Sequence, residues 1–379
     1  MASPLAAACA WLPLPSAALS LPGAQVAACA LSLLAAGCLV ERGGDAHVGR
    51  YAQALVALEY VAPLLAAPWS LWAFARSPWA LRAPLVAGLC LSYGWRTFCV
   101  NLGGHRYFAH RSFRCHALLE AAMAMTIELS TASLIYWLNF HAHHHAHCDT
   151  HRDLHTPDYT PFALTHNIAV WFTPGAGADG AQRADFYAAL QATREANRAH
   201  STKTYAHFHL PYGRYLYTRV WFAGTVLRLT PWAENAMVCA CLGPQACFWL
   251  ALLPKALATW ATTAQTNFGH CRALGDAPFR DRQTPTCHAR NIRWLALLNG
   301  GEGWHANHHA FPKALRHGFS DAQLDWSYDL FLSAFRRAGM VHDEVHIRPE
   351  VAAFAGVDDR KSEAARRAFA RPYEVRFRR

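Results

Sequence analysis

Residues 140–157 read FHAHHHAHCDTHRDLHTP, and seven of these eighteen residues are histidine. The stretch follows a mostly apolar run, residues 117–138, that is about as long as a membrane span. Such a stretch is either a surface tract that binds metal loosely or a set of fixed ligands in a built metal centre. The spacing of histidines along the whole chain separates these two interpretations.

The composition indicates a membrane protein with a substantial polar part. Of 379 residues, 53% are hydrophobic and 16% are charged, and the apolar residues gather in blocks. Much of the net charge of +10 comes from arginines near the end of the chain, which favours an anionic lipid surface over nucleic acid. The twelve cysteines include no CxxC pair and lie mostly in apolar runs, so we expect free thiols in a reducing compartment.

Three regions are predicted. Residues 1–50 form an apolar N-terminal extension in which 24–40 is either an extra membrane segment or a shielded hairpin. Residues 51–335 form the membrane domain and its polar part, and residues 336–379 form a basic C-terminal tail. Residues 185–213 and the chain beyond 315 are expected to be soluble helix and loop.

About four membrane-crossing helices are predicted. Residues 52–74 and 83–103 are each long and apolar enough for one span, and 216–268 is long enough for two. The turn between those two falls either at LGPQ (242–245), which we favour, or at LTPWAEN (229–235).

The run 117–138 has two interpretations. If the histidines on either side of it share one site, they lie on one side of the bilayer, and the run lies in the interface or dips in and returns. Otherwise the run crosses the membrane and the two groups of histidines are unrelated.

Three histidine clusters have ordered spacing. They are HxxxxH at His105 and His110, HxxHH at 141–145, and HxxHH again at 305–309. Positions i, i+3 and i+4 share one face of an α-helix, so each HxxHH is expected to direct three imidazoles at one point. Eight imidazoles are too many for one ion and suit two ions close together. The repeated HxxHH favours built ligation, and an open, all-histidine pair of ions suits redox iron and O2 better than structural zinc.

The quoted motifs GGHRYFAHRSF, HAHHHAHCDTHRDLHTP and GEGWHANHHAFP resemble the three histidine boxes of the membrane-bound fatty-acyl desaturases. The resemblance covers about residues 95–335 and is strongest to the stearoyl-CoA (delta-9) branch. It implies an all-α membrane protein with four transmembrane helices and a cytosolic helical cap that carries a di-iron site. It also implies two Fe²⁺ ions bound by His105, His110, His141, His144, His145, His305, His308 and His309.

The resemblance implies a ninth ligand at the end of the last span. The matching stretch is Thr266-Asn-Phe-Gly-His270, so His270 is the expected ligand. Family members usually have Asn four residues before this histidine, whereas Thr266 occupies that position here. The alternative for His270 is a capping residue at a helix end.

Several further residues are candidates for a supporting role around the ligands. Asp149, Asp153 and Glu302 could orient imidazoles, because ligand histidines need a hydrogen-bonded outer partner, or they could be helix caps and surface charges. His155 resembles a position that contacts either the ligands or the substrate head group. Four basic residues near the boxes could meet an electron donor or substrate phosphates, or be solvated: Arg106, Arg111, Arg152 and Lys313.

The implied activity is O2-dependent insertion of a cis double bond into a fatty-acyl chain carried by CoA or a lipid. The implied electron donor is a separate cytochrome b5 or ferredoxin-like protein, since no haem motif is present in the chain. The site would face the cytosol, from the endoplasmic reticulum in a eukaryote or the inner membrane in a bacterium. Acyl hydroxylases and other oxygenases share the scaffold. A metal-handling membrane protein is disfavoured because nearly all histidines lie just outside the predicted spans.

Overall fold

The computed structural model describes residues 45–130, 134–150, 220–358 and 360–378, together with Arg152, Asp153, Thr156 and His209. Most of the predicted N-terminal extension, including 24–40, and all of 185–213 except His209 lie outside the described residues. The chain divides into two compact units. Unit 1 contains residues up to Gly94, 128–131 and 221–257, and unit 2 contains the remainder.

Unit 1 is built from long apolar helices. They are α3 (Asp45–Arg76), most of α4 (Trp79–Phe98), α10 (Val220–Ala246), the π-helix η2 (Cys247–Leu252) and the start of α11 (Leu253–Phe268). The ring of Phe74 on α3 packs 4.6 Å from that of Trp249, and Ser92 Oγ donates to Leu250 O at 2.7 Å. Segments that are far apart in sequence therefore pack around η2.

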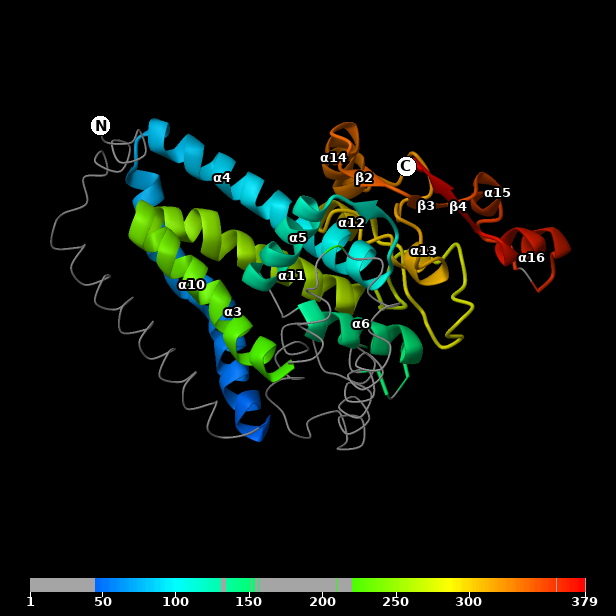
Figure 1. Cartoon of the computed structure of the whole chain (residues 1–379), viewed down its shortest axis with the longest axis horizontal. Coiled ribbons are helices and arrows are strands. Elements are labelled where there is room, and N and C mark those ends of the chain that lie inside the picture. Colours follow the sequence, from blue (N-terminus) through cyan, green and yellow to red (C-terminus); the bar gives the residue numbers. More distant parts are fainter. Residues whose placement is uncertain are drawn as a thin grey trace. The chain divides into compact units, whose positions relative to one another are not determined.

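The helix α10 is broken at Gly243, where φ is +86° and ψ is 168°. Lys255 Nζ lies 2.9 Å from Glu234 Oε2 and donates to Asn235 Oδ1 at 3.0 Å. Residues twenty positions apart on a straight helix would be separated by about 30 Å, so the chain must reverse between them. Figure 1 shows this reversal between α10 and α11. The prediction of a turn at LGPQ is confirmed, and LTPWAEN continues the helix.

One stretch of the described residues, Trp232–Phe268, is long and apolar enough to cross a membrane, and an 18-residue window within it has a mean hydropathy of 1.8. The break at Gly243 lies inside it, so its residues belong to both arms of the hairpin. Large apolar side chains are also exposed along α3 and α4, including Leu65 at 74% and Leu91 at 71%. Exposed apolar surface on this scale marks a face that meets lipid or protein.

The apolar run 117–138 contains two helices among the described residues. It forms α5 (Ala117–Ser130) and the first part of α6 (Leu134–His147), each 14 residues long. A helix of that length extends about 21 Å, which is shorter than the ~30 Å hydrocarbon core.

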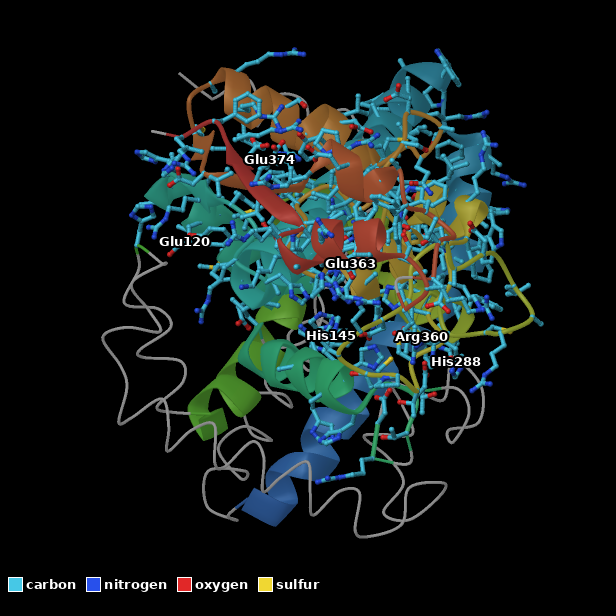
Figure 2. All side chains as sticks on the ribbon, turned by 90° about the vertical axis from the view of Figure 1, so that its right-hand side faces the viewer. Glu120, His145, His288, Arg360, Glu363 and Glu374 are labelled. Carbon is cyan, nitrogen blue, oxygen red and sulfur yellow. The ribbon has the colours of Figure 1, made fainter. Side chains whose placement is uncertain are left out.

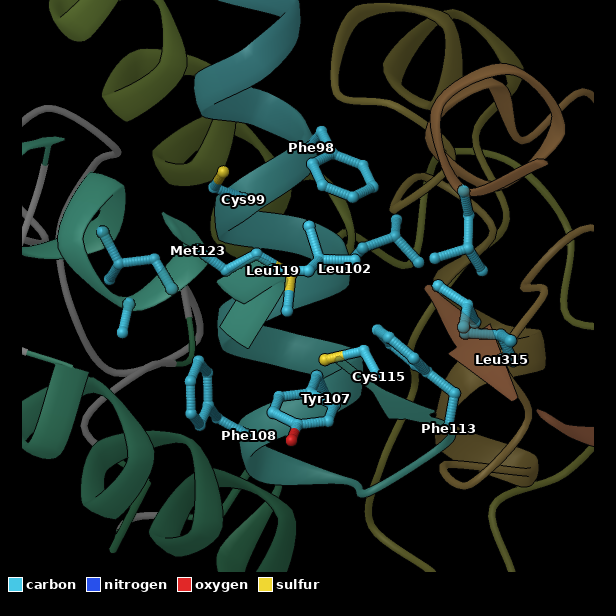
Figure 3. Packing of buried hydrophobic residues seen from close by; sticks show 14 of the residues in the cluster. Phe98, Cys99, Leu102, Tyr107, Phe108, Phe113, Cys115, Leu119, Met123 and Leu315 are labelled. Atoms are coloured by element: carbon cyan, nitrogen blue, oxygen red, sulfur yellow. The ribbon is translucent and has the colours of Figure 1, made fainter. Parts of the chain in front are cut away.

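Unit 2 carries the remaining elements. After the π-helix η1 (Cys99–Ala109), α5 and α6, they are mostly short: α12 (Arg293–Leu298), α13 (His305–Ala310), η3 (Ser327–Leu332), α14 (Ser333–Arg337), α15 (Pro349–Ala352) and α16 (Glu363–Ala370). The core of this unit packs η1 against α5, with Leu102, Tyr107 and Met123 fully buried (Figure 3). A Cβ at Gly103 would lie 3.0 Å from Met123 Cβ, so this glycine permits the close approach of the two helices.

The prediction of an all-α protein is wrong in one respect, because unit 2 contains two small antiparallel sheets. β1 (Arg114–Cys115) pairs with β2 (Val341–His342), and β3 (Glu344–Ile347) pairs with β4 (Tyr373–Arg376). These strands are too short to leave a periodic pattern, and pairing between distant segments decides them. The C-terminal region is folded, and its charged side chains pair with near neighbours in the sequence. The pairs include Arg360 with Asp358, Arg366 with Glu363 and Arg376 with Glu374. Arg360, Glu363 and Glu374 are labelled in Figure 2.

Two adjacent leucines on α5 test the packing of this core. Leu119 is 2% exposed and Leu118 is 67% exposed. Leu119→Ala should lower the free energy of unfolding by about 2–5 kcal/mol, because it leaves a cavity between η1 and α5. Leu118→Ala should change it by less than about 0.5 kcal/mol. Thermal unfolding of the detergent-solubilised protein measures both, and equal shifts would contradict the assignment of the buried face.

Candidate metal centre

Nine histidines gather in unit 2 as two groups. The donor atoms within each group lie within 4.8 Å of one another. The first group has five members, His105, His110, His141, His145 and His308, and the second has four, His144, His270, His305 and His309. The structure thus brings together all nine histidines that the sequence predicted as ligands, including His270.

The expectation that each HxxHH directs three imidazoles at one point is wrong. On α6, His141 and His145 belong to the five-histidine group and His144 to the other, and α13 splits its three in the same way. Positions i and i+4 are about 40° apart around an α-helix, whereas i+3 and i+4 are about 100° apart. Each motif therefore serves both groups, and the two groups share two helices.

The HxxxxH motif owes its geometry to a π-helix. In an α-helix, five residues turn through about 500°, so two such side chains would point about 140° apart. Instead η1 has i→i+5 hydrogen bonds, and the His110 N–H donates to His105 O at 3.1 Å. The two rings consequently lie on one side, with centroids 5.0 Å apart. The spacing of the motif thus matches the wider turn of the helix that carries it.

Carboxylates lie behind three of the rings. His105 Nδ1 lies 2.5 Å from Glu302 Oε2, His144 Nδ1 lies 2.9 Å from Asp153 Oδ2, and His270 Nδ1 lies 2.9 Å from Asp149 Oδ2. A carboxylate at Nδ1 holds the proton there and leaves the lone pair on Nε2. Each of the three acidic residues named as candidates therefore orients one of the nine imidazoles, and Asp149 and Glu302 also lie near Nδ1 of His288 and His317.

Every one of the nine Nε2 atoms lies close to another. The Nε2–Nε2 distances include His110–His141 at 2.8 Å, His270–His305 at 2.9 Å and His144–His309 at 3.3 Å. Lone pairs so close repel each other unless a cation lies between them. Two nitrogens bound to one ion at ~2.1 Å and ~90° apart would be about 3.0 Å from each other. Both groups therefore fit a metal ion.

The electrostatics of the site favour neutral imidazoles, the form that binds metal. Burial, followed by repulsion from neighbouring imidazoles, holds the pKa well below its usual value in His110, His141, His145, His305, His308 and His309. His144 differs. Burial disfavours its charged form, but the carboxylate of Asp153 outweighs that effect and raises its pKa.

Both interpretations of Arg106 are wrong. Its side chain is not solvated, and it is not accessible to an electron donor or to substrate phosphates. Its side chain is fully buried, and its guanidinium donates to Glu302 Oε1 at 2.9–3.0 Å and to Asp325 Oδ2 at 2.7 Å. Burial alone would raise the pKa of Glu302, but His105 and Arg106 hold it well below its usual value. The arginine therefore keeps Glu302 ionised behind His105. The other three basic candidates, Arg111, Arg152 and Lys313, are exposed.

Two thiols form part of the surroundings of the four-histidine group, which the sequence did not indicate. Cys287 Sγ lies 3.2 Å and Cys148 Sγ lies 3.8 Å from His309 Nδ1, with Asp281 Oδ2 at 3.6 Å. A further imidazole, His317, is fully buried with its ring 4.6 Å from that of His308. Burial and then Arg106 lower the pKa of His317 to about 4. Lone histidines and cysteines outside spaced motifs carry no signal in a single sequence.

A cavity of about 60 Å³ lies beside both groups. Its walls include members of the five-histidine group and of the four-histidine group, with Val100, Asn101, Thr262, Gln265, Thr266 and Asn299 completing them. Thr266 is the residue in the position where the family usually has Asn, and its Oγ1 donates to Thr262 O at 3.3 Å. His155 lies outside the described residues, and His143 turns its Nε2 to Arg152 O at 2.9 Å.

Unusual backbone conformations next to two of the histidine motifs bring the ligands and their carboxylate partners to the site. Asp149 follows α6 with φ +56°, and its N–H donates to Asp153 Oδ2 at 2.9 Å. Gly300 and Gly301 have φ of +71° and +104°, which L-residues rarely adopt. A side chain at Gly301 would also collide with Asp325. These glycines let the chain turn from α12 so that Glu302 and His305 face the other ligands.

Comparison with known proteins gives the class. A family model described as fatty acid desaturase matches residues 79–328. The chain is 43% identical over 60 residues to the Delta-9 desaturase-like 2 protein of Arabidopsis thaliana, which is 16% of this chain and 19% of that protein. It is 42% identical over 67 residues to the sn-1 stearoyl-lipid 9-desaturase of Synechocystis sp., 17% of this chain and 20% of that protein.

A longer match covers more than half of the chain. The chain is 26% identical over 252 residues to the Acyl-CoA Delta-12 desaturase of Tribolium castaneum, which covers 61% of this chain and 63% of that protein. Because the family model matches well over half of the chain, the chain belongs to the fatty acid desaturase family. The matched stretches span less than two thirds of the length of these relatives.

The buried arginine network has a measurable consequence. Arg106→Met would leave the carboxylates of Glu302 and Asp325 buried without their partner, so the free energy of unfolding should fall by about 3–5 kcal/mol. The matched control is Arg367→Met, which removes an exposed pair with Glu363 and should cost less than about 1 kcal/mol. Thermal unfolding compares the two, and a similar loss in both would contradict a special role for Arg106.

The carboxylate behind His144 should set how tightly metal is held. Asp153→Asn removes the charge that fixes the His144 tautomer, so metal affinity should fall about ten- to a hundredfold. Asp321→Asn, which changes an exposed carboxylate, serves as the control. The amount of metal retained against increasing chelator measures the effect, and equal retention in both variants would exclude this role.

Proposed function

We propose that this protein is an O2-dependent fatty-acyl desaturase that introduces a cis double bond, at the delta-9 position, into an acyl chain carried by CoA or a lipid. The nine histidines of the two groups hold two Fe²⁺ ions, five imidazoles for one ion and four for the other. The names of the Arabidopsis and Synechocystis relatives, a delta-9 desaturase-like protein and a stearoyl-lipid 9-desaturase, support the position of the double bond.

One observation carries this proposal: nine imidazole Nε2 atoms converge as two adjacent groups beside a single cavity. A storage or transport protein would gain nothing from two adjacent groups held in fixed tautomers. When bound, an iron pair would activate O2, which supplies the oxidising power that removal of hydrogen from an unactivated CH2 requires.

The protein's own residues orient the ligands and exclude water. Glu302, Asp153 and Asp149 fix the rings from behind, and Arg106 fixes Glu302 in turn. The ligands His144, His270, His305, His308 and His309 are all at most 6% exposed. A dry, preorganised site strengthens electrostatic interactions and limits side reactions with water.

We also propose that the protein spans the membrane four times, with α3 and α4 as one pair and the arms of the α10–α11 hairpin as the other. The arms 220–242 and 244–268 are each long enough to cross, at about 1.5 Å per residue. The exposed leucines of α3 and α4 would then contact lipid. The histidine-bearing part of the chain that follows these helices would form the cap on the cytosolic side.

The proposed partners are a fatty-acyl substrate, the lipid bilayer and a separate electron donor of the cytochrome b5 or ferredoxin kind. The net charge of +10 favours an acidic donor. The exposed residues Arg111, Arg152 and Lys313 lie close in sequence to the ligands and are candidates for its docking surface.

Expression in a host that lacks its own desaturase tests the proposal. The full chain should bind two irons and produce a new monounsaturated acid. His144→Ala should lose iron and product, because it removes a member of the four-histidine group. His143→Ala, one position away, should retain both, since the His143 ring turns to the backbone of Arg152.

Iron analysis and mass spectrometry of the fatty acids distinguish the outcomes. A double bond at another position of the acyl chain would show that the delta-9 assignment is wrong. A hydroxylated product would show that the enzyme is an acyl hydroxylase with the same scaffold. Absence of stoichiometric iron in the unaltered protein would overturn the di-iron proposal.

A further inference from the structure

Two thiols, Cys148 and Cys287, lie together in unit 2 although they are far apart in the sequence. With Asp149 and His270 they form a group in which the four donor atoms, one from each side chain, lie within 4.8 Å of one another. We call this group the thiol cluster. Cys148 is fully buried and Cys287 is half-buried. Neither thiol belongs to the five- or the four-histidine group, so the proposed iron site does not account for the pair.

Hydrogen bonds on both sides of Cys287 hold it against the end of α6. Thr286 Oγ1 donates to Cys148 O at 2.7 Å, and the His288 N–H donates to Asp149 Oδ2 at 2.9 Å. The backbone next to each thiol is therefore fixed in place. Such preorganisation favours metal binding, because ligands on two mobile segments would lose conformational entropy when an ion joined them.

The distances within the thiol cluster are compatible with tetrahedral coordination. A thiolate at ~2.3 Å and a carboxylate oxygen at ~2.1 Å from one ion are about 3.6 Å apart, and two such thiolates are about 3.8 Å apart. Cys148 Sγ lies 3.5 Å from Asp149 Oδ2, and the two Sγ atoms lie within 4.8 Å of each other. One ion can therefore contact these three groups after only a small shift of the sulfur atoms.

A second carboxylate borders the pair of thiols. Asp281 is 6% exposed, and its Oδ2 lies 3.6 Å from His309 Nδ1. Cys287 Sγ lies 3.2 Å from the same nitrogen, so the carboxylate and the thiol share a neighbour. Burying several potential anions in one place is costly without a cation to compensate them. The surroundings of the thiols therefore favour a bound cation.

We propose that Cys148, Cys287 and Asp149 bind a third metal ion, a thiophilic divalent cation such as Zn²⁺, and that Asp281 supplies a further carboxylate. Binding converts two S–H groups into two zinc–thiolate bonds and releases two protons to water. His270 keeps its Nε2 directed at the four-histidine group, 2.9 Å from the Nε2 of another member. The third ion thus goes beyond the proposed iron pair and does not compete with it for this nitrogen.

The donor set selects the class of ion. Thiolates bind zinc and other thiophilic metals, whereas Mg²⁺ and Ca²⁺ prefer oxygen ligands. The ion would join the end of α6 to residues 284–288 and would hold Asp149, which orients His270. A closed site with cysteine ligands is typical of structural zinc, so its main effect is expected on stability.

The experiment uses the full-length, iron-loaded protein in detergent, kept reduced, equilibrated with Zn²⁺ and freed of loosely bound metal. The expected result is one zinc ion per chain with sulfur neighbours at ~2.3 Å. X-ray absorption at the zinc edge measures this without interference from iron. It also distinguishes the thiol cluster from the histidine groups, because zinc in those groups would have no sulfur neighbour.

Two substitutions test the ligands. Cys148→Ser and Cys287→Ser each remove one thiolate and should weaken zinc binding by more than about tenfold, since even the outer partners of metal ligands contribute that much. Zinc should raise the midpoint of thermal unfolding of the unaltered protein, because it binds the folded state only. The same zinc concentration should leave the midpoint of either variant unchanged.

Cys271→Ser is the matched control. Cys271 is also half-buried and lies between α11 and α12, as Cys287 does, but it is not a member of the thiol cluster. Its substitution removes a thiol from the same segment of the chain. The control variant should therefore keep the bound zinc, its sulfur neighbours and the rise in unfolding temperature.

The outcomes separate this inference from the proposed function. Zinc with sulfur neighbours, lost in both cluster variants and kept in the control, supports the third site. Zinc with only nitrogen and oxygen neighbours in the unaltered protein overturns it, as does the absence of stoichiometric zinc, and neither result depends on a variant that folds. Iron is measured in the same samples, and its absence from the unaltered protein would overturn the proposed function and not the thiol site.

Discussion

The close approach of nine imidazole nitrogens is the constraint on which the arrangement of unit 2 depends. Nε2 atoms 2.8–3.3 Å apart repel one another when their protons lie on the far side of the rings. Burial adds to the cost because it removes the water that would solvate them. The fold therefore has to hold these side chains in place, and a bound cation would convert the repulsion into attraction.

Two successive sets of groups behind the rings hold the imidazoles in place. Carboxylates contact Nδ1 of three imidazoles, and other groups hold those carboxylates: Arg106 binds Glu302, and the Asp149 N–H donates to Asp153. Positive backbone φ at Asp149, Gly300 and Gly301 brings these groups to the site. Glycine adopts such φ values without steric cost, whereas the strain at Asp149 persists only where the surrounding structure compensates for it.

Chain continuity links the apolar helices to the ligands. The helix α4 runs directly into η1, which carries His105, and α11 ends at Phe268, two residues before His270. The same α11 carries Gln265 and Thr266 into the cavity wall. The positions of these two ligands along the chain are therefore set by the ends of α4 and α11.

The sequence by itself determined the mainly helical class, the turn at LGPQ and the eight histidines of the three spaced motifs, because motif spacing and the lengths of apolar runs are local properties, whereas His270 was implied only by the resemblance to the desaturases. Only the tertiary structure divided each HxxHH between two groups, replaced an α-helix by the π-helix η1 and buried Arg106. It also decided the two small sheets and the thiols beside His309. These features depend on contacts between segments far apart in the chain, and such contacts leave no periodic trace in a single sequence.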